Sequence, residues 1–343
     1  MDPIRSLVRR PIVVAPMAGG PSTPALVVAA AEAGALGFLA AGYRTVESMR
    51  EDVDAVRAAT SEPYGVNVFV PGTRTTRPDL VNSYVASLAR EAADLGAALG
   101  EPLWDDDHWG PKVDGLLADP PPVVSFTFGC PEREIVAAFR AAGSVVVVTV
   151  TSAGEARLAA GAGADCLCVQ GPAAGAHRGT FSPHEDPAAD RDLRTLVSEV
   201  AVVTDLPQIA AGGITSASEV TAALQAGAVA VQCGTAFLRC PESGANPLHK
   251  GALADPRFTS TAVTRSFSGR PARALVNRFV RDHPDAPAAY PEINNATRPL
   301  RAGAAASKDV DRMSLWAGTG FRQAVDRPAA EIVDLLAGAL PPR

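Results

Sequence analysis

The sequence predicts a (β/α)8 TIM barrel with a smaller elaboration over its C-terminal mouth. Short apolar runs alternate with amphipathic helical stretches from residue 12 to residue 234, and repeated βα units of this kind form parallel sheets. Eight such runs occur, each followed by a helix or a helix-start signal, which favours a closed barrel over an open, doubly wound sheet. No G-x-G-x-x-G motif follows the first run, which disfavours a dinucleotide-binding Rossmann fold.

The expected strands are short, apolar and bounded by turn residues or helix caps. They cover residues 12–16, 36–41, 64–70, 123–128, 144–150, 165–170, 208–211 and 229–234. The first helix is expected at 24–32, because Ser22 or Thr23 can cap it and Pro24 suits its first turn. Further helices are expected at 46–59, 80–99, 193–203 and 218–225, and after Cys130 and Ser152. An Ala-Gly-Ala phrase ends three helices, at 33–35, 162–164 and 226–228, where Gly supplies a left-handed cap.

Residues 240–313 differ in composition from the barrel units and are rich in Arg, Pro and Asn. We expect a division into a barrel, residues 1–240 and 314–343, and a small substrate-covering subdomain, residues 241–313. The stretch from Trp316 to about Leu340 is expected to be the helix that closes the barrel.

Composition excludes several classes of partner. The 343 residues are 47% hydrophobic with a net charge of -6, so no basic footprint indicates nucleic acid or an anionic membrane. No uninterrupted apolar stretch is long enough to span a bilayer. The first ten residues lack a secretory core, and five Cys form no paired framework, so a cytoplasmic location is expected. No His pair has metal spacing, so no metal is expected.

Two glycine-containing loops indicate a phosphate site. Gly212-Gly213-Ile214 follows the seventh expected strand and Gln232-Cys233-Gly234-Thr235 ends the eighth. Loops at these two places form the usual phosphate site of such barrels, through backbone N–H groups. The alternative is that the glycines only make tight turns.

Polar side chains interrupt two expected strands near their C-terminal ends. Asn67 and Gln170 are amides in otherwise apolar runs, and a buried amide needs a partner. A heterocycle with carbonyl and N–H edges, such as a flavin, would supply one. The alternative is a structural amide satisfied within the protein.

His177 is the leading catalytic candidate. It follows a loop of small residues, 171–176, that leaves the C-terminal end of the sixth expected strand, where barrel enzymes place their chemistry. An imidazole there suits general-base catalysis, although a lone His is often structural. The other histidines, at 108, 184, 249 and 283, lack this setting.

Several of these segments together resemble the nitronate monooxygenase family, formerly called 2-nitropropane dioxygenases. They are residues 11–43, 65–67, 170–179, 211–214, 232–235 and 315–318. The resemblance runs over nearly the whole chain and implies a TIM barrel that binds FMN non-covalently. The chain departs from the family at Ala173 and Ala176, in the loop that precedes His177 (residues 171–176, the His loop). It departs again at Thr319, directly after the segment 315–318. Tyr290 is the only tyrosine of the elaboration, and family members place tyrosines in the substrate pocket.

The resemblance also implies roles for individual residues. Asn67 and Gln170 would contact the flavin, with Met17 near its ring, and His177 matches the family's proposed base. Arg178 is either a substrate contact or a surface charge, and Lys308 is a candidate anion contact. The residues implied to hold the flavin and its phosphate are Gly175, Gly212, Gly213, Gln232, Cys233, Gly234 and Thr235.

The expected activity is oxidation of a nitronate or nitroalkane by O₂ to a carbonyl compound and nitrite. The expected partners are these small molecules, with neither nucleic acid nor membrane, and the protein would be a monomer or homodimer. One alternative is an FMN-dependent enoyl-thioester reductase that uses NAD(P)H. Others are a phosphate-binding barrel without redox chemistry and a non-catalytic flavin-binding barrel.

Overall fold

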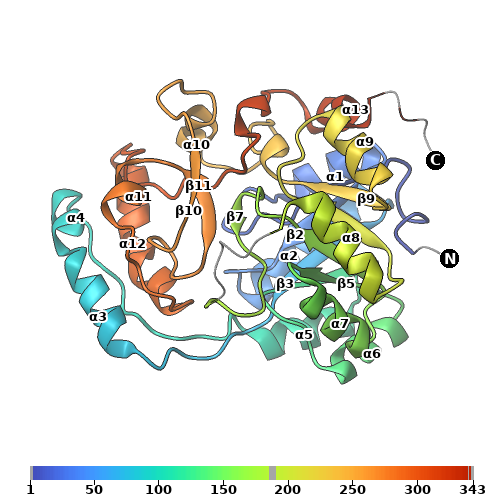
Figure 1. Cartoon of the computed structure of the whole chain (residues 1–343), viewed down its shortest axis with the longest axis horizontal. Helices are drawn as coiled ribbons and strands as arrows, with labels where there is room; N and C mark the ends of the chain where they lie inside the picture. Colours follow the sequence, from blue (N-terminus) through green and yellow to red (C-terminus); the bar gives the residue numbers. More distant parts are fainter. Residues whose placement is uncertain (1–2, 185–190, 339, 341–343) are drawn as a thin grey trace.

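Eight parallel strands close into a barrel in the computed structural model, which describes residues 3–184, 191–338 and 340. The strands run β1-β2-β3-β4-β5-β6-β8-β9, and β9 pairs back onto β1 with Val13 opposite Gln232. This confirms the predicted (β/α)8 barrel, which fills the right-hand part of Figure 1. The barrel strands are β1 Ile12–Val14, β2 Leu36–Ala40, β3 Tyr64–Phe69, β4 Val123–Thr127, β5 Val145–Val150, β6 Cys166–Gln170, β8 Gln208–Ala211 and β9 Ala230–Cys233.

Helices surround the barrel and bury its outer face. Thr23, Ser152 and Ser216 each accept a hydrogen bond from a backbone N–H in the first turn of the helix that follows, as side-chain caps do. The surrounding helices are α1 Pro24–Glu32, α2 Val46–Ala59, α5 Trp109–Ala118, α6 Arg133–Ala141, α7 Ala153–Ala162, α8 Leu193–Val203, α9 Ala217–Gln225 and α13 Ala329–Ala337. Within the described ranges, no helix is long and apolar enough to cross a membrane.

The closing helix begins later than predicted. It is α13, which starts at Ala329, whereas residues 316–328 are irregular apart from a short 3-10 turn, η3 (Phe321–Gln323). Trp316 pairs with Ala274 instead of opening a helix. The glycines at 318 and 320 explain the difference, because glycine disfavours a helix interior.

Apolar side chains fill the barrel interior at the end where the strands begin. Ile4 and Val8 from the N-terminal segment join this cluster and close the end of the barrel where the strands begin. Cys166 and Cys168 both belong to it, as expected for residues two apart on one strand. The opposite end of the barrel is therefore the one available for a site.

A small three-stranded sheet lies beside that open end. Its order is β10 (Thr261–Thr264), β11 (Ala272–Leu275) and β7 (Ala176–His177). β7 belongs to the loop after β6, so the candidate catalytic residue is a strand residue, paired with Ala272. The helices nearby in the sequence are η2 Thr235–Phe237, α10 Pro247–Ala252, α11 Arg278–Asp282 and α12 Glu292–Ala306.

The segment after β3 joins the small subdomain. Helices α3 (Pro78–Ser87) and α4 (Ala89–Asp94) lie beside α11 and α12 at the left of Figure 1. Tyr84 and Leu88 share an apolar cluster with Phe267 and Phe279, and the Tyr84 hydroxyl donates to Ser266 O at 2.7 Å. We therefore propose a subdomain of residues 241–313 together with α3 and α4.

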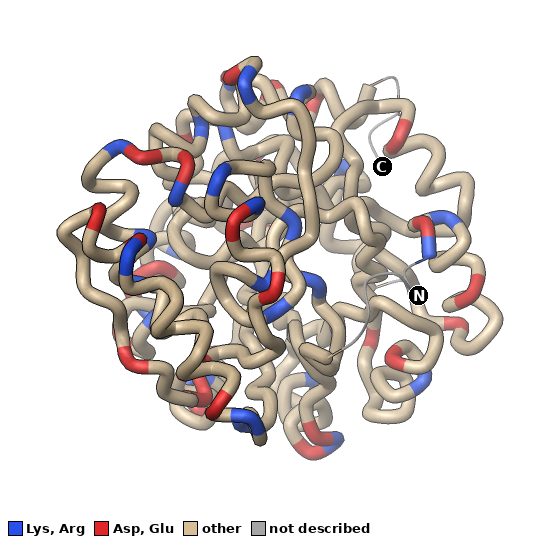
Figure 2. The backbone as a smooth tube through the Cα atoms, turned by 60° about the vertical axis from the view of Figure 1, so that its left-hand side comes forward, with Lys and Arg blue, Asp and Glu red and all other residues tan. Residues whose placement is uncertain are grey.

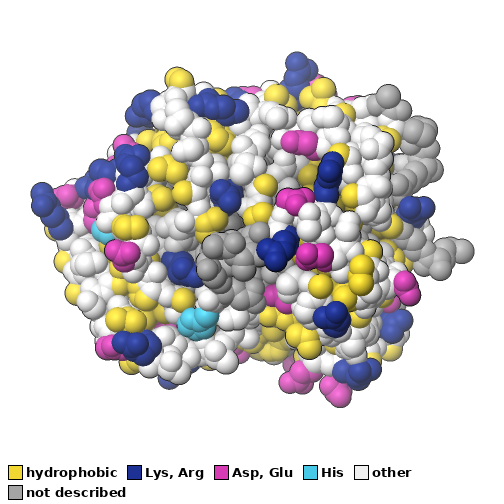
Figure 3. Space-filling view, in the orientation of Figure 1, with side chains coloured by type: hydrophobic (Ala, Val, Ile, Leu, Met, Phe, Trp, Pro, Cys, Tyr) yellow, Lys and Arg dark blue, Asp and Glu magenta, His cyan; other side chains and the backbone are white. Residues whose placement is uncertain are grey.

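Acidic and basic side chains are interspersed on the surface. Figure 2 shows both signs along the same stretches of backbone, and Figure 3 shows neighbouring Lys or Arg and Asp or Glu side chains across its face. Many form exposed ion pairs, such as Arg9 with Glu62 at 2.7 Å. Such pairs contribute little to stability.

A buried ion cluster holds α4 to the small subdomain. Glu91 of α4 is 8% exposed and accepts hydrogen bonds from Arg278 at 2.7 and 2.8 Å and from Arg312. The hydrogen bonds from the two guanidinium groups lower the pKa of Glu91 from 4.5 to about 2. Its folded pKa lies below its unfolded value, so this stabilisation is present above pH 4.5 and is lost as the pH falls toward 2.

We expect Glu91→Gln to lower the free energy of unfolding at pH 7 by about 2 kcal/mol, because it removes the buried carboxylate that Arg278 and Arg312 share. Both arginines are only half-buried and keep other carboxylate partners, which limits the loss. The loss should shrink toward pH 3, where the wild-type carboxyl begins to protonate. Urea unfolding at both pH values measures this. Glu62→Gln, at an exposed pair, should cost less than about 1 kcal/mol; equal losses for the two variants would contradict the assignment.

Candidate active site

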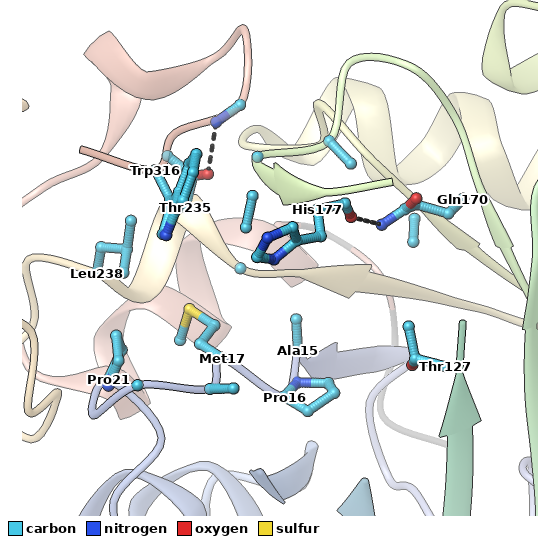
Figure 4. A pocket seen from close by; sticks show the side chains of 18 of the residues that line it. Ala15, Pro16, Met17, Pro21, Thr127, Gln170, His177, Thr235, Leu238 and Trp316 are labelled. Atoms are coloured by element: carbon cyan, nitrogen blue, oxygen red, sulfur yellow. Dashed lines mark hydrogen bonds between the residues drawn. The ribbon is translucent and has the colours of Figure 1, made fainter. Parts of the chain in front are cut away.

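A cavity of about 530 Å³ opens at the ends of the barrel strands, between the barrel and the small subdomain. Figure 4 shows His177 pointing into it, with Met17 and Pro16 on one side and Trp316 and Thr235 on another. The structure brings together here Met17, Asn67, Gln170, Gly175, His177, Gly212, Gly213, Gln232, Cys233, Gly234 and Thr235. These candidates are far apart in the sequence, and the carboxyl ends of parallel strands gather them at one end of the barrel.

A belt of polar side chains crosses the strand ends on the cavity wall. Asn67 Nδ2 donates to Ser125 Oγ at 2.8 Å and to Thr127 Oγ1 at 3.0 Å. Thr127 Oγ1 lies 3.3 Å from Thr149 Oγ1 on the next strand. Within the described chain Asn67 Oδ1 has no hydrogen-bond partner, and Asn67 lines the cavity. Asn67 is therefore fixed by its neighbours while an acceptor remains for a ligand.

Gln170 clips the His loop to the end of β6. Its Nε2 donates to His177 O at 3.1 Å, the contact drawn in Figure 4. Its Oε1 accepts from Gly179 N at 2.8 Å and from Arg178 at 3.0 Å. Both the oxygen and the nitrogen of the amide thus hold the loop. These contacts are those expected of a structural amide that is satisfied within the protein.

His177 is held in an aromatic box with one polar contact. Its Nε2 lies 2.8 Å from Ser268 Oγ, and its ring is 5.3 to 5.8 Å from the rings of Phe128, Tyr290 and Trp316. Burial, together with the smaller effects of the Arg270 and Arg301 charges, lowers the pKa of His177 from 6.5 to about 3. The imidazole is therefore neutral at neutral pH and one ring nitrogen carries a lone pair.

Two weaker candidates lie outside the cavity wall. Arg178 is not a surface charge: it is 2% exposed, and its Nη1 donates to Gln170 O at 2.8 Å and Gly171 O at 3.0 Å. These contacts stabilise the loop, because the guanidinium satisfies buried carbonyl groups. Lys308 is exposed beyond the C-terminus of α12 and does not line the cavity. Neither residue lines the cavity, and a substrate contact by either stays a prediction.

The comparisons with known proteins agree on one family. A family model for nitronate monooxygenase matches residues 3–338. The chain belongs to the nitronate monooxygenase family. A nitronate monooxygenase from Pseudomonas aeruginosa is 39% identical and covers 96% of this chain and 95% of its own. A probable nitronate monooxygenase from Bacillus subtilis is 36% identical, covering 91% and 90%.

Solved structures show the same relationship. Nitroalkane oxidase from Streptomyces ansochromogenes superposes with a TM-score of 0.96 at 48% identity, covering 98% of this chain and 97% of its own. FabK from Thermotoga maritima is more distant, with a TM-score of 0.72 at 25% identity, covering 98% and 94%. The protein is therefore an oxidoreductase of a flavin-dependent family that converts nitronates or nitroalkanes oxidatively.

The cavity fits a flavin nucleotide. Its volume lies in the usual range for ligand sites, and the polar belt that ends in Asn67 suits the polar edge of a flavin ring. Gly213, with φ of 77°, and Gly234 contribute amides that donate no hydrogen bond within the described chain. Thr235 Oγ1 accepts from Gly318 N at 2.9 Å, the second contact drawn in Figure 4, and its hydroxyl proton is still available to a phosphate.

Three residues that line the cavity have strained backbone conformations. Tyr43, Phe128 and Ala176 line it with φ values of 65°, 78° and 60°, in the left-handed region that costs a side chain with a Cβ roughly 1–2 kcal/mol. Ala176 is thus a strained residue directly before His177.

We expect Ala176→Gly to raise the free energy of unfolding by about 0.5–1 kcal/mol, because relief of strain outweighs the added unfolded-state entropy. Chemical denaturation measures the change. Ala174→Gly, in the same loop but without positive φ, should lower stability by a similar amount. A loss in both variants would show that Ala176 is not strained.

Sequence reasoning missed three residues around His177. Ser268 lies 91 residues from His177 in the sequence, so no local pattern signals their contact. The Tyr43 hydroxyl lies 3.0 Å from that of Tyr290, 247 residues away. Arg301 could have been found, because Asn294, Arg298 and Arg301 have the spacing of one helix face.

Proposed function

We propose that this protein binds FMN in the cavity and oxidises nitroalkanes and nitronates to carbonyl compounds and nitrite, with His177 as the base. The observation that carries the proposal is a neutral, half-buried imidazole held against Ser268 at the cavity wall. FMN would supply the acceptor for the substrate's electrons and the route by which they reach O₂. Asn67 would contact the ring, and the amides of Gly213 and Gly234 would bind the phosphate.

The tautomer of His177 follows from the contacts of Ser268. The Ser268 hydroxyl donates to Arg270 O at 3.3 Å, so the Nε2–H of His177 donates to Ser268 Oγ and Nδ1 keeps the lone pair. A lone pair on a ring fixed in this way can accept the α-proton of a neutral nitroalkane. The rings of Phe128, Tyr290 and Trp316 exclude water from the transfer. A nitronate has already lost that proton and needs no base.

Product analysis tests this function. Purified protein given nitroethane or ethylnitronate in air should consume O₂ and release nitrite and acetaldehyde in equal amounts, without NADH or NADPH. Flavin released by acid should be FMN. Oxygen consumption without nitrite, or a requirement for NAD(P)H, would contradict the proposal.

Two further properties are part of the same proposal. We infer a cytoplasmic location, because five cysteines form no disulfide in the structure. We also infer a monomer or homodimer, which light scattering of the purified protein would distinguish.

A further inference from the structure

A cationic helix face forms one wall of the cavity. Asn294, Arg298 and Arg301 lie at positions i, i+4 and i+7 of α12 and all line the cavity, as this spacing requires for one face. Among the described residues that line the cavity there is no Asp or Glu. The two guanidinium groups therefore meet no carboxylate within the cavity.

The guanidinium group of Arg301 is hydrogen-bonded through Nη2, whereas its Nε–H has no hydrogen-bond partner among the described residues. Its Nη2 donates to Asn294 O at 3.0 Å and to Asn294 Oδ1 at 2.9 Å. Its Nε is buried without a hydrogen-bond partner in the part of the chain that the structure describes. An unpaired N–H on a desolvated cation is costly, so this arrangement is expected where a ligand completes it.

The surrounding groups do not neutralise Arg301. Burial raises the pKa of both Tyr43 and Tyr290, so their hydroxyls stay uncharged. Asp107 lies 2.8 Å from Lys112 and is paired with that cation. Arg298 is exposed and donates to Asn295 Oδ1 at 3.2 Å. The positive charge of Arg301 is thus available to an anion in the cavity.

Arg301 also acts on His177, because its charge helps to keep the imidazole neutral. That effect opposes proton transfer to His177 unless a negative charge forms nearby. In the proposed reaction the α C–H bond breaks and its proton goes to His177. The electron pair enters the nitro group, so the carbon–nitrogen double bond forms and the negative charge lies on two oxygens. A guanidinium cation stabilises such a charge through charge-assisted hydrogen bonds from its N–H groups.

We propose that the guanidinium of Arg301 binds the nitro group through the N–H groups that Asn294 leaves free, and holds the nitronate as its charge forms. Asn294 is the positioning residue, because its two oxygens hold Nη2 of Arg301. The inference rests on the proposed function and names the residue that recognises the substrate's oxyanion.

Nitrate is the probe for this site, because it is a planar oxyanion like the nitronate head group. Its affinity for the flavin-loaded enzyme is measured from the change in the flavin absorption spectrum and, independently, from the rise in melting temperature. Arg301→Met should weaken nitrate binding about 10- to 100-fold, which corresponds to the loss of a charge-assisted hydrogen bond. Arg301→Lys keeps the charge but lacks the guanidinium N–H groups, so its affinity for nitrate should lie between that of Arg301→Met and that of the wild type.

Arg298→Met is the matched control on the same helix face. It should weaken nitrate binding by no more than about threefold, because its exposed charge is screened. The KM for ethylnitronate should rise in Arg301→Met and Arg301→Lys more than in this control. If Arg301→Met does not fold, Arg301→Lys decides by the same comparison.

Three results would overturn the inference: no nitrate binding by the wild type, equal binding in the wild type and both Arg301 variants, or an equal loss in Arg298→Met. Failure of the proposed function is a separate result, because it would appear as a wild-type enzyme that releases no nitrite. Nitrate binding would still report on Arg301 in that case.

Discussion

Replacement of His177 by Asn is expected to lower kcat/KM for neutral nitroalkanes by about 10²- to 10⁴-fold, the usual contribution of a positioned general base. Nitronates should lose less than about tenfold, because their α-proton is already gone. Asn is a suitable substitute because it is neutral, polar and smaller than His and has no basic nitrogen. Its amide corresponds in position to Nδ1, the proposed base, and not to Nε2, which lies 2.8 Å from Ser268. Initial rates of nitrite release from nitroethane and from ethylnitronate measure both effects.

The exposed His184 provides the control. His184→Asn should leave both substrates unchanged. If His177→Asn reduces both substrates equally, His177 has a role in binding or packing, and if it reduces neither, another group removes the proton.

Gly175→Ala is expected to have the largest effect on stability in the His loop. A Cβ at this position would lie 2.5 Å from Gly318 N and 2.7 Å from the carbonyl carbon of Ala317, and backbone atoms cannot move aside cheaply. We expect the free energy of unfolding to fall by about 2 kcal/mol or more, with weakened flavin retention. Urea unfolding and the flavin content of the purified variant measure the two effects.

Gly161→Ala is the matched control, because Gly161 lies in α7 with no atom near its added Cβ. This change should be neutral or stabilise by up to about 1 kcal/mol. A Gly175→Ala protein as stable as wild type would show that the loop and the Trp316–Gly318 segment do not pack closely.

The barrel could be predicted from sequence because its determinants are local. Each strand is a short apolar run that contacts its neighbour in the chain, and caps such as Thr23 and Ser152 mark the helix starts. The small subdomain was harder, because its sheet uses a two-residue strand from the His loop. The packing of α3 and α4 on α11 and α12 joins segments nearly 200 residues apart, for example Glu91 with Arg278, at a separation of 187.

The residues of the site also differ in whether local sequence determines their placement. Asn67 near the end of β3 and His177 on the loop after β6 could be placed at this end of the barrel, because the fold fixes where strand ends and their loops lie. Their orientation could not be predicted, since the Gln170 contacts that hold the loop depend on three-dimensional turns. Arg178 follows His177 directly, yet it is buried against carbonyl groups, because neighbours on an extended segment point in opposite directions.

The most direct test of the account is the anaerobic spectrum of the purified yellow protein. Ethylnitronate should bleach the bound flavin, whereas NADH and NADPH should leave it oxidised over the same period. Bleaching by NADH or NADPH but not by ethylnitronate would contradict the proposed function and support a reductase on the same barrel.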